Sequence, residues 1–287
     1  MKKKSKDGVT VRKVDEPKTW DEFYKAFLNL LPKVSNSHNP TDIFRDVCRI
    51  FSLSIRGTVT ISQIEKDEIE KQYQSFVAKY GNDGMGKIAM LLAYVVEALE
   101  LRRSDFLGHV YEALNATVRG WGQFFTPDSV SVLMAKMITV CQEKKPGEII
   151  RVNDPSCGAG ALLIAGVEGL IEKGFRQGDI LVYGEDLDET ACCIFYVQAS
   201  LLGYAGIVTR MDSLTRKISE GPWYTPCYFA HGIPMRLLSN ETPSASVEVE
   251  DEGAQQEEED NTFSGNCNDS SMDIRKIVQG EFDFSFD

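Results

Sequence analysis

The residues best suited to chemistry are three carboxylates, Asp154, Glu185 and Asp212, each of which comes directly after a short apolar run. The first precedes the turn Pro155-Ser156-Cys157-Gly158-Ala159-Gly160. Glycine allows a backbone to approach a ligand closely, and parallel sheets bind their ligands at the carboxyl ends of the strands. The pattern therefore predicts a site for a nucleotide-like ligand where the three acids converge.

Alternating strands and helices must position these acids. We expect strands at 149–153, 180–184 and 206–210 and helices at 161–173 and 189–202, from apolar runs and helical spacing. This βαβαβ run is one half of a doubly wound sheet. Right-handed crossovers would give the strand order 3-2-1. The fold class predicted is therefore α/β, with a truncated Rossmann-like half-sheet in residues 121–238.

A helical domain is predicted ahead of the sheet, over residues 18–120. Apolar residues recur there at three- and four-residue spacing, which is typical of amphipathic helices. Ser104 and Asp105 are suited to cap the last helix. The expected helices are 21–31, 41–53, 61–80, 88–101 and 106–115.

The two ends of the chain differ sharply in charge. Residues 241–287 hold 14 acids and 2 bases, which accounts for the whole net charge of −12. We expect 1–17 to be a disordered basic arm, which could touch phosphates or simply be solvated. Residues 239–287 are predicted to be an acidic, mostly disordered tail. After Leu214 no strand–helix unit is evident, and 282–286 alternate aromatic and polar residues as either a strand or a frayed end would.

Composition excludes several classes of protein. There is no apolar run long enough for a membrane span and no signal peptide at the start, so a cytoplasmic protein is expected. The seven cysteines show no disulfide framework. His38, His109 and His231 lack the spacing of metal ligands, so no metal is expected.

Two further segments carry a resemblance to a known family. These are Asp105-Phe106-Leu107-Gly108-His109-Val110-Tyr111-Glu112 and Gly122-Gln123-Phe124-Phe125-Thr126-Pro127. Together with the glycine-rich turn and the strand-end acids, they resemble the DNA adenine-N6 methyltransferases (N-6 DNA methylases). The likeness is to the modification subunit of type I restriction systems in particular. It covers about residues 104–215 and implies S-adenosylmethionine (SAM) as cofactor and DNA as substrate.

The resemblance implies a role for each candidate. Asp154 would hold the ammonium of SAM, Glu185 the ribose hydroxyls, and Asp212 the exocyclic amine of the adenine ring. The structural alternatives are a helix cap for Asp154 and an ordinary loop acid for Glu185. The remaining cofactor-binding candidates are Pro155, Ser156, Gly158 and Gly160 of the turn and Phe124, Phe125, Thr126 and Pro127 of the aromatic motif.

The family's catalytic string, Asn/Asp-Pro-Pro followed by an aromatic, does not occur. The nearest candidate is Thr225-Pro226-Cys227-Tyr228, in which Thr225, Pro226 and Tyr228 are degenerate counterparts. A threonine hydroxyl does not reproduce the acceptor of Asn or Asp, so methyl transfer would be much slower.

Two functions therefore stay open. One is an adenine-N6 DNA methyltransferase, acting alone or with specificity or other modification subunits. The other is an inactive SAM-binding or partner-binding regulator of a restriction–modification system, of mobile-element or phage type. Its acidic tail could occupy basic surfaces of a partner, or serve only solubility. A small-molecule methyltransferase is a weaker third class, because no small-substrate pocket is evident.

Overall fold

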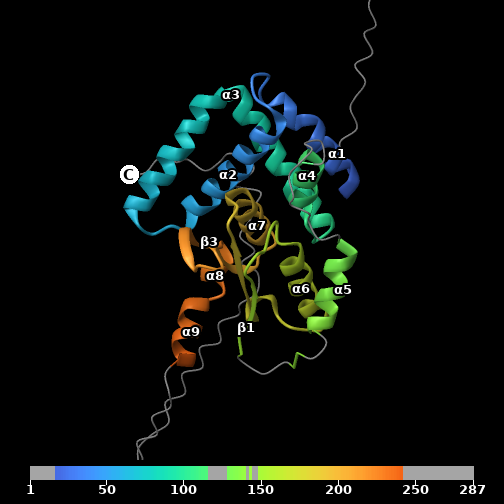
Figure 1. Cartoon of the computed structure of the whole chain (residues 1–287), viewed down its shortest axis with the longest axis vertical. Helices are drawn as coiled ribbons and strands as arrows, with labels where there is room; N and C mark the ends of the chain where they lie inside the picture. The colour runs from blue at the N-terminus through green and yellow to red at the C-terminus, as the bar shows by residue number, and fades with distance from the viewer. Residues whose placement is uncertain (1–16, 116–127, 140–141, 144–147, 242–287) are drawn as a thin grey trace, which may run out of the picture.

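The computed structural model describes residues 17–115, 128–139, 142–143 and 148–241 of the 287-residue chain. Helices from the first part of the chain lie above a four-stranded sheet in the view of Figure 1. One hydrophobic core joins the two regions, since it runs from Phe27 of the helical region to Val208 of the sheet. No helix among the described residues is long and apolar enough to cross a membrane.

The helical region contains α1 (Trp20–Leu30), α2 (Pro40–Val59), α3 (Gln63–Leu101) and α4 (Phe106–Asn115), with a 3-10 turn at Leu31–Lys33. Local signals fix their starts. Thr19 and Glu22 form a capping box on α1, and Asn39 caps α2 just before a proline at the first helical position. The two helices predicted at 61–80 and 88–101 form one element, α3, which is broken at Gly81 by a φ of 63°. The remaining expected helices are confirmed.

The sheet has the strands β1 (Ile150–Asp154), β2 (Ile180–Asp186), β3 (Ala205–Asp212) and β4 (Lys217–Tyr224) in the order β1-β2-β3-β4. The first three strands are parallel, with β2 in the middle. The fourth is antiparallel to β3. The same region contains the helices α5 (Asp128–Thr139), α6 (Ala161–Glu172) and α7 (Glu189–Leu201). A 3-10 turn at Gln177–Asp179 precedes β2.

Regular structure continues after Leu214, where the sequence showed no evident strand–helix unit. The chain turns back into β4 and continues as α8 (Pro226–Ala230) and α9 (Ile233–Glu241). The pattern was hard to read because β4 has a single buried residue, Trp223, and contains Gly221 and Pro222, which are depleted in strands.

Helices cover both faces of the sheet. Apolar residues of α6 and α7 pack on one face, in the same cluster as Val182 and Val208. On the other face, Tyr228 of α8 and Ile233 of α9 pack against Leu181. The helix α7 lies between the sheet and α2, and residues 191–200 of it are all buried. Cys192 and Cys193 are thus packing residues of a central helix, as expected from their position.

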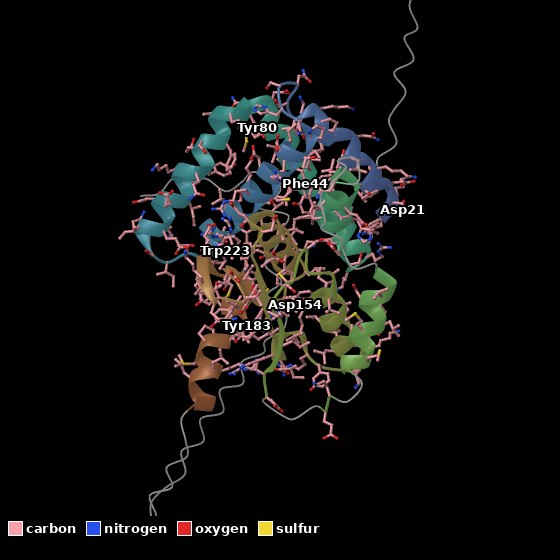
Figure 2. The ribbon with its side chains drawn as sticks, viewed as in Figure 1. Asp21, Phe44, Tyr80, Asp154, Tyr183 and Trp223 are labelled. Atoms are coloured by element: carbon pink, nitrogen blue, oxygen red, sulfur yellow. The ribbon has the colours of Figure 1, made fainter. Side chains whose placement is uncertain are left out.

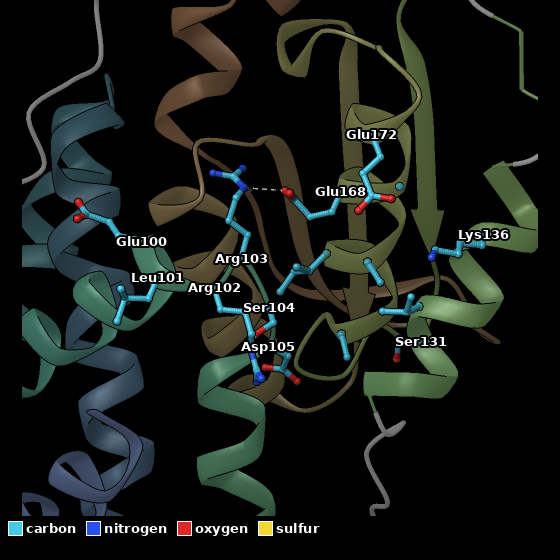
Figure 3. Close-up of a pocket in the computed structure, with 15 residues that line it drawn as sticks. Glu100, Leu101, Arg102, Arg103, Ser104, Asp105, Ser131, Lys136, Glu168 and Glu172 are labelled. Carbon is cyan, nitrogen blue, oxygen red and sulfur yellow. Dashed lines mark hydrogen bonds and ion pairs between the residues drawn. The ribbon is translucent and has the colours of Figure 1, made fainter. Parts of the chain in front are cut away.

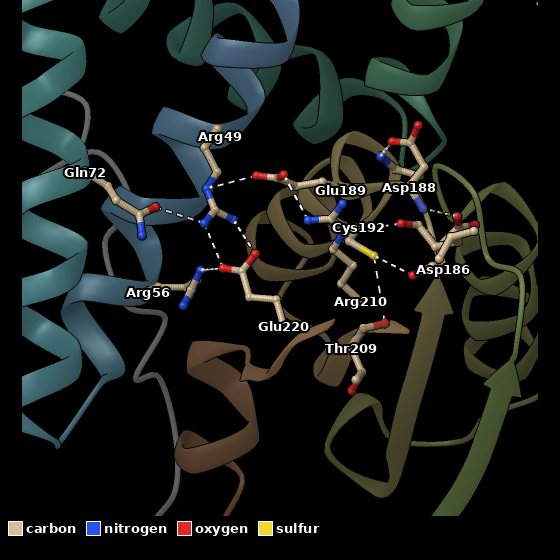
Figure 4. Close-up of polar contacts among 12 residues, drawn as sticks. Arg49, Arg56, Gln72, Asp186, Asp188, Glu189, Cys192, Thr209, Arg210 and Glu220 are labelled. Atoms are coloured by element: carbon tan, nitrogen blue, oxygen red, sulfur yellow. Dashed lines mark hydrogen bonds and ion pairs between the residues drawn. The ribbon is translucent and has the colours of Figure 1, made fainter. Parts of the chain in front are cut away.

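A partly buried ionic network fastens the helical region to β4 (Figure 4). Arg49 of α2 donates to Glu220 at 2.7 Å and Arg56 donates to it at 3.2 Å. The Arg56 guanidinium also lies 4.5 Å from the centre of the Trp223 ring, a favourable cation–π distance. Arg49 pairs with Glu189 at the start of α7 as well. The ends of β2 and β3 are therefore held in a fixed position relative to the helices.

Gln198 makes a second connection, which reaches the glycine-rich turn. Its side-chain oxygen accepts from the backbone N–H groups of Phe106 and Leu107, at 2.7 and 2.9 Å. Its nitrogen donates to the Asp105 carboxylate and to the backbone oxygen of Ala159. Asp105 itself accepts from Gly108 N and so caps α4, as predicted. One buried carboxamide thus links α7, the start of α4 and the turn after β1.

Candidate ligand site at the carboxyl edge of the sheet

A shallow depression of about 330 Å³ lies where the three parallel strands end. Each strand contributes to it: Pro155 and Ser156 follow β1, Asp186 and Leu187 end β2, and residues 211–214 end β3. Figure 2 shows Asp154 at the lower, sheet-containing part of the molecule. The three strand ends thus meet at one edge, which is the arrangement required of a site at the carboxyl ends of parallel strands.

The carboxylate of Asp154 lies in an electrostatically unfavourable environment. Its carboxylate accepts one hydrogen bond, from Ser156 N at 3.0 Å. Burial raises the pKa of this carboxyl, the Ser156 bond opposes the rise, and the nearby Asp186 adds to it. No ion pair to Asp154 occurs within the described parts of the chain. A cation placed here would relieve both the burial and the repulsion.

Asp186 organises the glycine-rich turn, a role that the sequence did not reveal. One carboxylate oxygen accepts from Gly158 N at 2.9 Å and the other accepts from Asp188 N at 2.9 Å. The N–H of Cys157 donates to the backbone oxygen of Glu185. Two hydrogen bonds, from Gly158 N and Cys157 N, therefore hold the turn to the end of β2. The only sequence signal was a second acid directly after Glu185.

Two glycines of the site, Gly160 and Gly184, leave space for the ring of Phe195. A Cβ on Gly160 or on Gly184 would collide with the ring of Phe195 in α7. Gly160 also has a φ of +91° and stands at the start of α6, a conformation that costs other residues energy. These glycines therefore let α6 and β2 approach α7 closely, which sets the depth of the turn at the site.

Glu185 is already engaged. Its carboxylate accepts from the Arg216 guanidinium at 2.9 Å, and its side chain is 14% exposed, whereas that of Arg216 is 65% exposed. Arg216 lies in the turn between β3 and β4 with a φ of 59°, which side chains rarely adopt. A ligand that uses Glu185 must therefore compete with Arg216. The pairing was not predictable, because 31 residues separate the two.

Asp212 closes its own turn. Its carboxylate accepts from the backbone N–H groups of Leu214 and Thr215 at 3.0 and 3.2 Å. The bond from Thr215, followed by that from Leu214, lowers the pKa of Asp212. The Ser213 hydroxyl next to it donates to the backbone oxygen of Pro155, which ties the β3 turn to the β1 turn.

Two large apolar side chains stand beside these acids. Leu187 is 63% exposed and Leu214 is 96% exposed, and both line the depression. Isolated exposed leucines are common on protein surfaces. Two that line the same depression, one after β2 and one after β3, offer apolar contact to a flat ring. Sequence reasoning missed both, because each lies in a turn outside any periodic element.

The structure does not bring Thr225, Pro226 and Tyr228 to this site. β4 runs antiparallel to β3, with Lys217 opposite Asp212 and Tyr224 opposite Ile207. Thr225 therefore lies at the amino edge of the parallel strands, about 20 Å from Asp212 at 3.3 Å per residue. Its hydroxyl donates to Tyr204 O at 2.7 Å and accepts from Gly206 N at 2.8 Å.

This placement corrects the sequence-based counterpart of the catalytic string. The side chain of Thr225 is fully buried and both of its hydrogen-bonding functions are used inside the fold. Tyr228 is buried as well and packs on Tyr224. Thr225-Pro226-Cys227-Tyr228 was chosen by its order along the sequence. The strand before it, β4, is antiparallel to β3 and therefore carries the segment to the opposite edge of the sheet.

The aromatic motif Phe124-Phe125-Thr126-Pro127 lies outside the described residues. A larger hollow, of about 530 Å³, lies between α5, α6 and the link from α3 to α4 (Figure 3). Two of its charged side chains pair with each other: Arg103 donates to Glu168 at 2.8 Å, and it also donates to Leu202 O at 2.9 Å. It follows the length of α6 instead of the strand ends. No group of three or more metal-ligating side chains occurs in the portion of the chain described.

Part of the chain is similar to known proteins. Residues 102–220 match the model of the family described as N-6 DNA Methylase. Over 119 residues the chain is 29% identical to the type I restriction enzyme MjaIX methylase subunit of Methanocaldococcus jannaschii. That alignment covers 40% of this chain and 20% of the methylase subunit, so the chain spans about a fifth of that relative.

Two solved structures are also similar. One is a type I restriction-modification system methyltransferase subunit from Streptococcus thermophilus, with a TM-score of 0.39 and 14% identity, covering 69% of this chain and 59% of that one. The other is a putative class I S-adenosylmethionine-dependent methyltransferase from Listeria monocytogenes, with a TM-score of 0.40 and 16% identity, covering 75% and 69%. The match over residues 102–220, about two fifths of the chain, is a likeness to the N-6 DNA methylase family.

Proposed function

We propose that the depression at the carboxyl edge binds S-adenosylmethionine and that the chain serves methyl transfer to adenine N6 in DNA. The observation that carries this proposal is the convergence of three strand ends on one depression, which Asp186 and Asp212 line, beside a glycine-rich turn. The family match over residues 102–220 supports the same ligand class.

The residues present fit this cofactor. Asp154 is a partly buried carboxylate with a raised pKa, next to a second carboxylate. An ammonium group is the partner that such a pair favours, because it neutralises the negative charge and donates hydrogen bonds to the carboxylate oxygens. Asp154 would therefore hold the amino-acid end of SAM, with the turn of Ser156, Gly158 and Gly160 close to it.

The nucleoside end would lie along the ends of β2 and β3. Leu187 and Leu214 would contact the two sides of the adenine ring, since both are exposed beside the depression. Glu185 would accept from the ribose hydroxyls once Arg216 has moved away. Asp212 would accept from the exocyclic amine with the lone pairs that its two backbone bonds leave over.

When bound, SAM supplies an electrophilic methyl group. The chain's own residues bind and orient it, but Thr225 cannot hold the adenine amine of DNA, because its hydroxyl is used between Tyr204 and Gly206. Transfer would then need an acceptor group from outside the described residues, either elsewhere in this chain or in a partner such as a specificity or modification subunit.

The commitment of Thr225 also favours a second candidate function, a SAM-binding regulator without activity of its own. Methylation assays separate the two. We would incubate the protein with SAM and DNA, alone and with candidate modification and specificity subunits, and quantify N6-methyladenine by mass spectrometry. Product under any of these conditions supports the enzyme, whereas SAM binding without product under all of them supports the regulator.

Binding itself is tested by calorimetric titration with SAM and with S-adenosylhomocysteine. We expect micromolar affinity for both that Asp154→Ala abolishes. Asp83→Ala is the matched control, because Asp83 is an exposed acid of α3, 86% exposed and far from the sheet edge in sequence and structure. Absence of binding by the intact protein would contradict the proposal, as would equal losses in the two variants.

A further inference from the structure

The outer edge of β1 has no partner strand within the described residues. β1 is an outermost strand of the sheet. Its one neighbour among the described strands, β2, forms hydrogen bonds with only one side of its backbone. An edge strand presents a row of unpaired N–H and C=O groups, which readily pair with a further strand. The strand at the other edge, β4, is antiparallel to β3 and contacts α2 through Glu220.

A groove follows this edge. It has a volume of about 190 Å³ and is lined by every residue of β1, by Leu163, Gly166 and Leu170 of α6, and by Ala135 of α5. Its floor is apolar because Ile150 and Val152 point to the α6 side of the sheet, in the main core cluster. The opposite face of β1 is polar, since Arg151 and Asn153 are exposed there.

A strand that fits this edge must therefore alternate. Its apolar side chains would face the groove and its polar ones the side of Arg151, ideally with an acid. Phe282-Asp283-Phe284-Ser285-Phe286 has this pattern: three aromatics at every second position and, between them, Asp283 and Ser285. We propose that this segment of the chain adds to the outer edge of β1 as a fifth strand, with Asp283 beside Arg151.

The chain is long enough to reach. Forty residues connect Glu241, where α9 ends, to Phe282. A flexible chain of that length has a root-mean-square span of about 35 Å. The sheet that α9 packs beneath is about 14 Å wide across its four strands. A linker of this kind gives a local concentration of about a millimolar, which favours the chain's own segment over a second copy.

The inference does not depend on the bound cofactor. In this arrangement Phe282, Phe284 and Phe286, which belong to an otherwise strongly acidic region, face the groove between β1 and α6. Burial of each ring there is favourable. The same addition would cover the part of the groove next to Asp154, which is also one of its lining residues.

Hydrogen–deuterium exchange of the full chain tests the proposal. We expect the outward-facing amides of Ile150–Asp154 to exchange at least tenfold faster in Phe284→Asp than in the unmodified protein. The matched control is Phe263→Asp, which makes the same change between the acidic stretch and the proposed strand and should alter nothing in β1. Equal exchange in all three proteins would overturn the proposal.

A charge reversal gives an independent reading. Arg151→Glu should raise the exchange of β1, and adding Asp283→Arg should restore most of the protection. Arg151 is exposed, so neither change should disturb the core. Failure of the second change to restore protection would contradict the pairing. Protection that depends on protein concentration, together with a dimer in sedimentation, would assign the edge to a second copy and overturn the intramolecular arrangement.

Discussion

The two edges of the same sheet use similar polar residues in opposite ways. At the amino edge, Thr225 bonds to Tyr204 and Gly206, and Arg236 donates to Gly178 O at 2.6 Å and pairs with Asp179 at 2.8 Å. At the carboxyl edge, Asp154 lies close to another acid with one hydrogen bond from the protein and no cation beside it in the described structure.

The difference shows what distinguishes a site from a scaffold. Residue type alone does not, because a polar residue after a strand occurs at both edges. What differs is whether the fold already satisfies the group. A buried acid that the fold leaves incompletely paired costs stability, so it persists where a ligand completes it, whereas paired groups at the amino edge contribute to the fold itself. Substitutions at the amino edge should therefore change stability, whereas substitutions at the carboxyl edge should change ligand binding.

The largest effect is expected for Gly160→Ala, at the carboxyl edge. The new Cβ would collide with Phe195 and the φ of +91° would be strained, so we expect a loss of about 3 kcal/mol in unfolding free energy and no SAM binding. Gly174→Ala is the control, because it has a φ of +88° but open space around it. Chemical denaturation should show a loss of about 1 kcal/mol there. Equal losses would show that the Phe195 contact is unimportant.

Thr225→Val should act on stability alone. It removes the donor to Tyr204 O and the acceptor for Gly206 N, so we expect a loss of about 1–3 kcal/mol in unfolding free energy. Thr225→Ser, which keeps the hydroxyl, should lose less. SAM affinity, measured by calorimetry on the folded variants, should not change. A drop in affinity at unchanged stability would return Thr225 to the ligand site.

Asp154→Asn should separate binding from stability. The folded-state pKa of Asp154 is raised, so its contribution to stability is complete below the unfolded pKa and is lost as the pH rises through the folded pKa. Asn stays neutral, so the variant should be more stable than the original protein at neutral pH, by no more than about 4 °C in melting temperature, and equal at acid pH.

The same titration governs ligand binding. SAM affinity of the unmodified protein should fall as the pH drops, starting above the usual range of a carboxyl, because protonated Asp154 no longer attracts an ammonium group. In Asp154→Asn the affinity should be at least tenfold lower and independent of pH in this range. A variant that melts lower at neutral pH would show that the carboxylate is already stabilised in the free protein.

The smallest effect is expected for Arg216→Ala. An exposed ion pair is worth about 0.2–1 kcal/mol, so freeing Glu185 should tighten SAM binding by no more than about fivefold and leave the melting temperature nearly unchanged. Lys217→Ala serves as the control, because this neighbouring cation is exposed and makes no contact with Glu185. Weaker binding in Arg216→Ala would mean that the guanidinium holds the ligand instead of competing with it.

The sequence predicted the parts of this molecule that depend on local order. Apolar runs located β1, β2 and β3 to within two residues at each end, and the position of the acids after them followed directly. The glycine-rich turn was evident for the same reason. Helices with clear caps, such as α1 and α4, were also predictable, because Thr19 and Asp105 act within their own first turns.

What the sequence did not reveal depends on contacts between distant segments. The direction of β4, and with it the location of Thr225, is set by its pairing with β3 and not by its own residues. The engagement of Glu185 by Arg216 depends on the turn that this hairpin creates. Glu185 and Asp186 are adjacent acids, and only the alternation of a strand, fixed by register, decides which one holds the turn.

Gln198 has a consequence for how the protein is made. The first turn of α4 receives two of its hydrogen bonds from a side chain 92 residues further along the chain. A ribosome that has released residues 17–115 has therefore delivered a helical region whose last helix has its Asp105 cap but lacks the two bonds from Gln198. We expect it to stay open to proteases until α7 has emerged. Native folding of the early helices and of the turn after β1 then completes in a single late step.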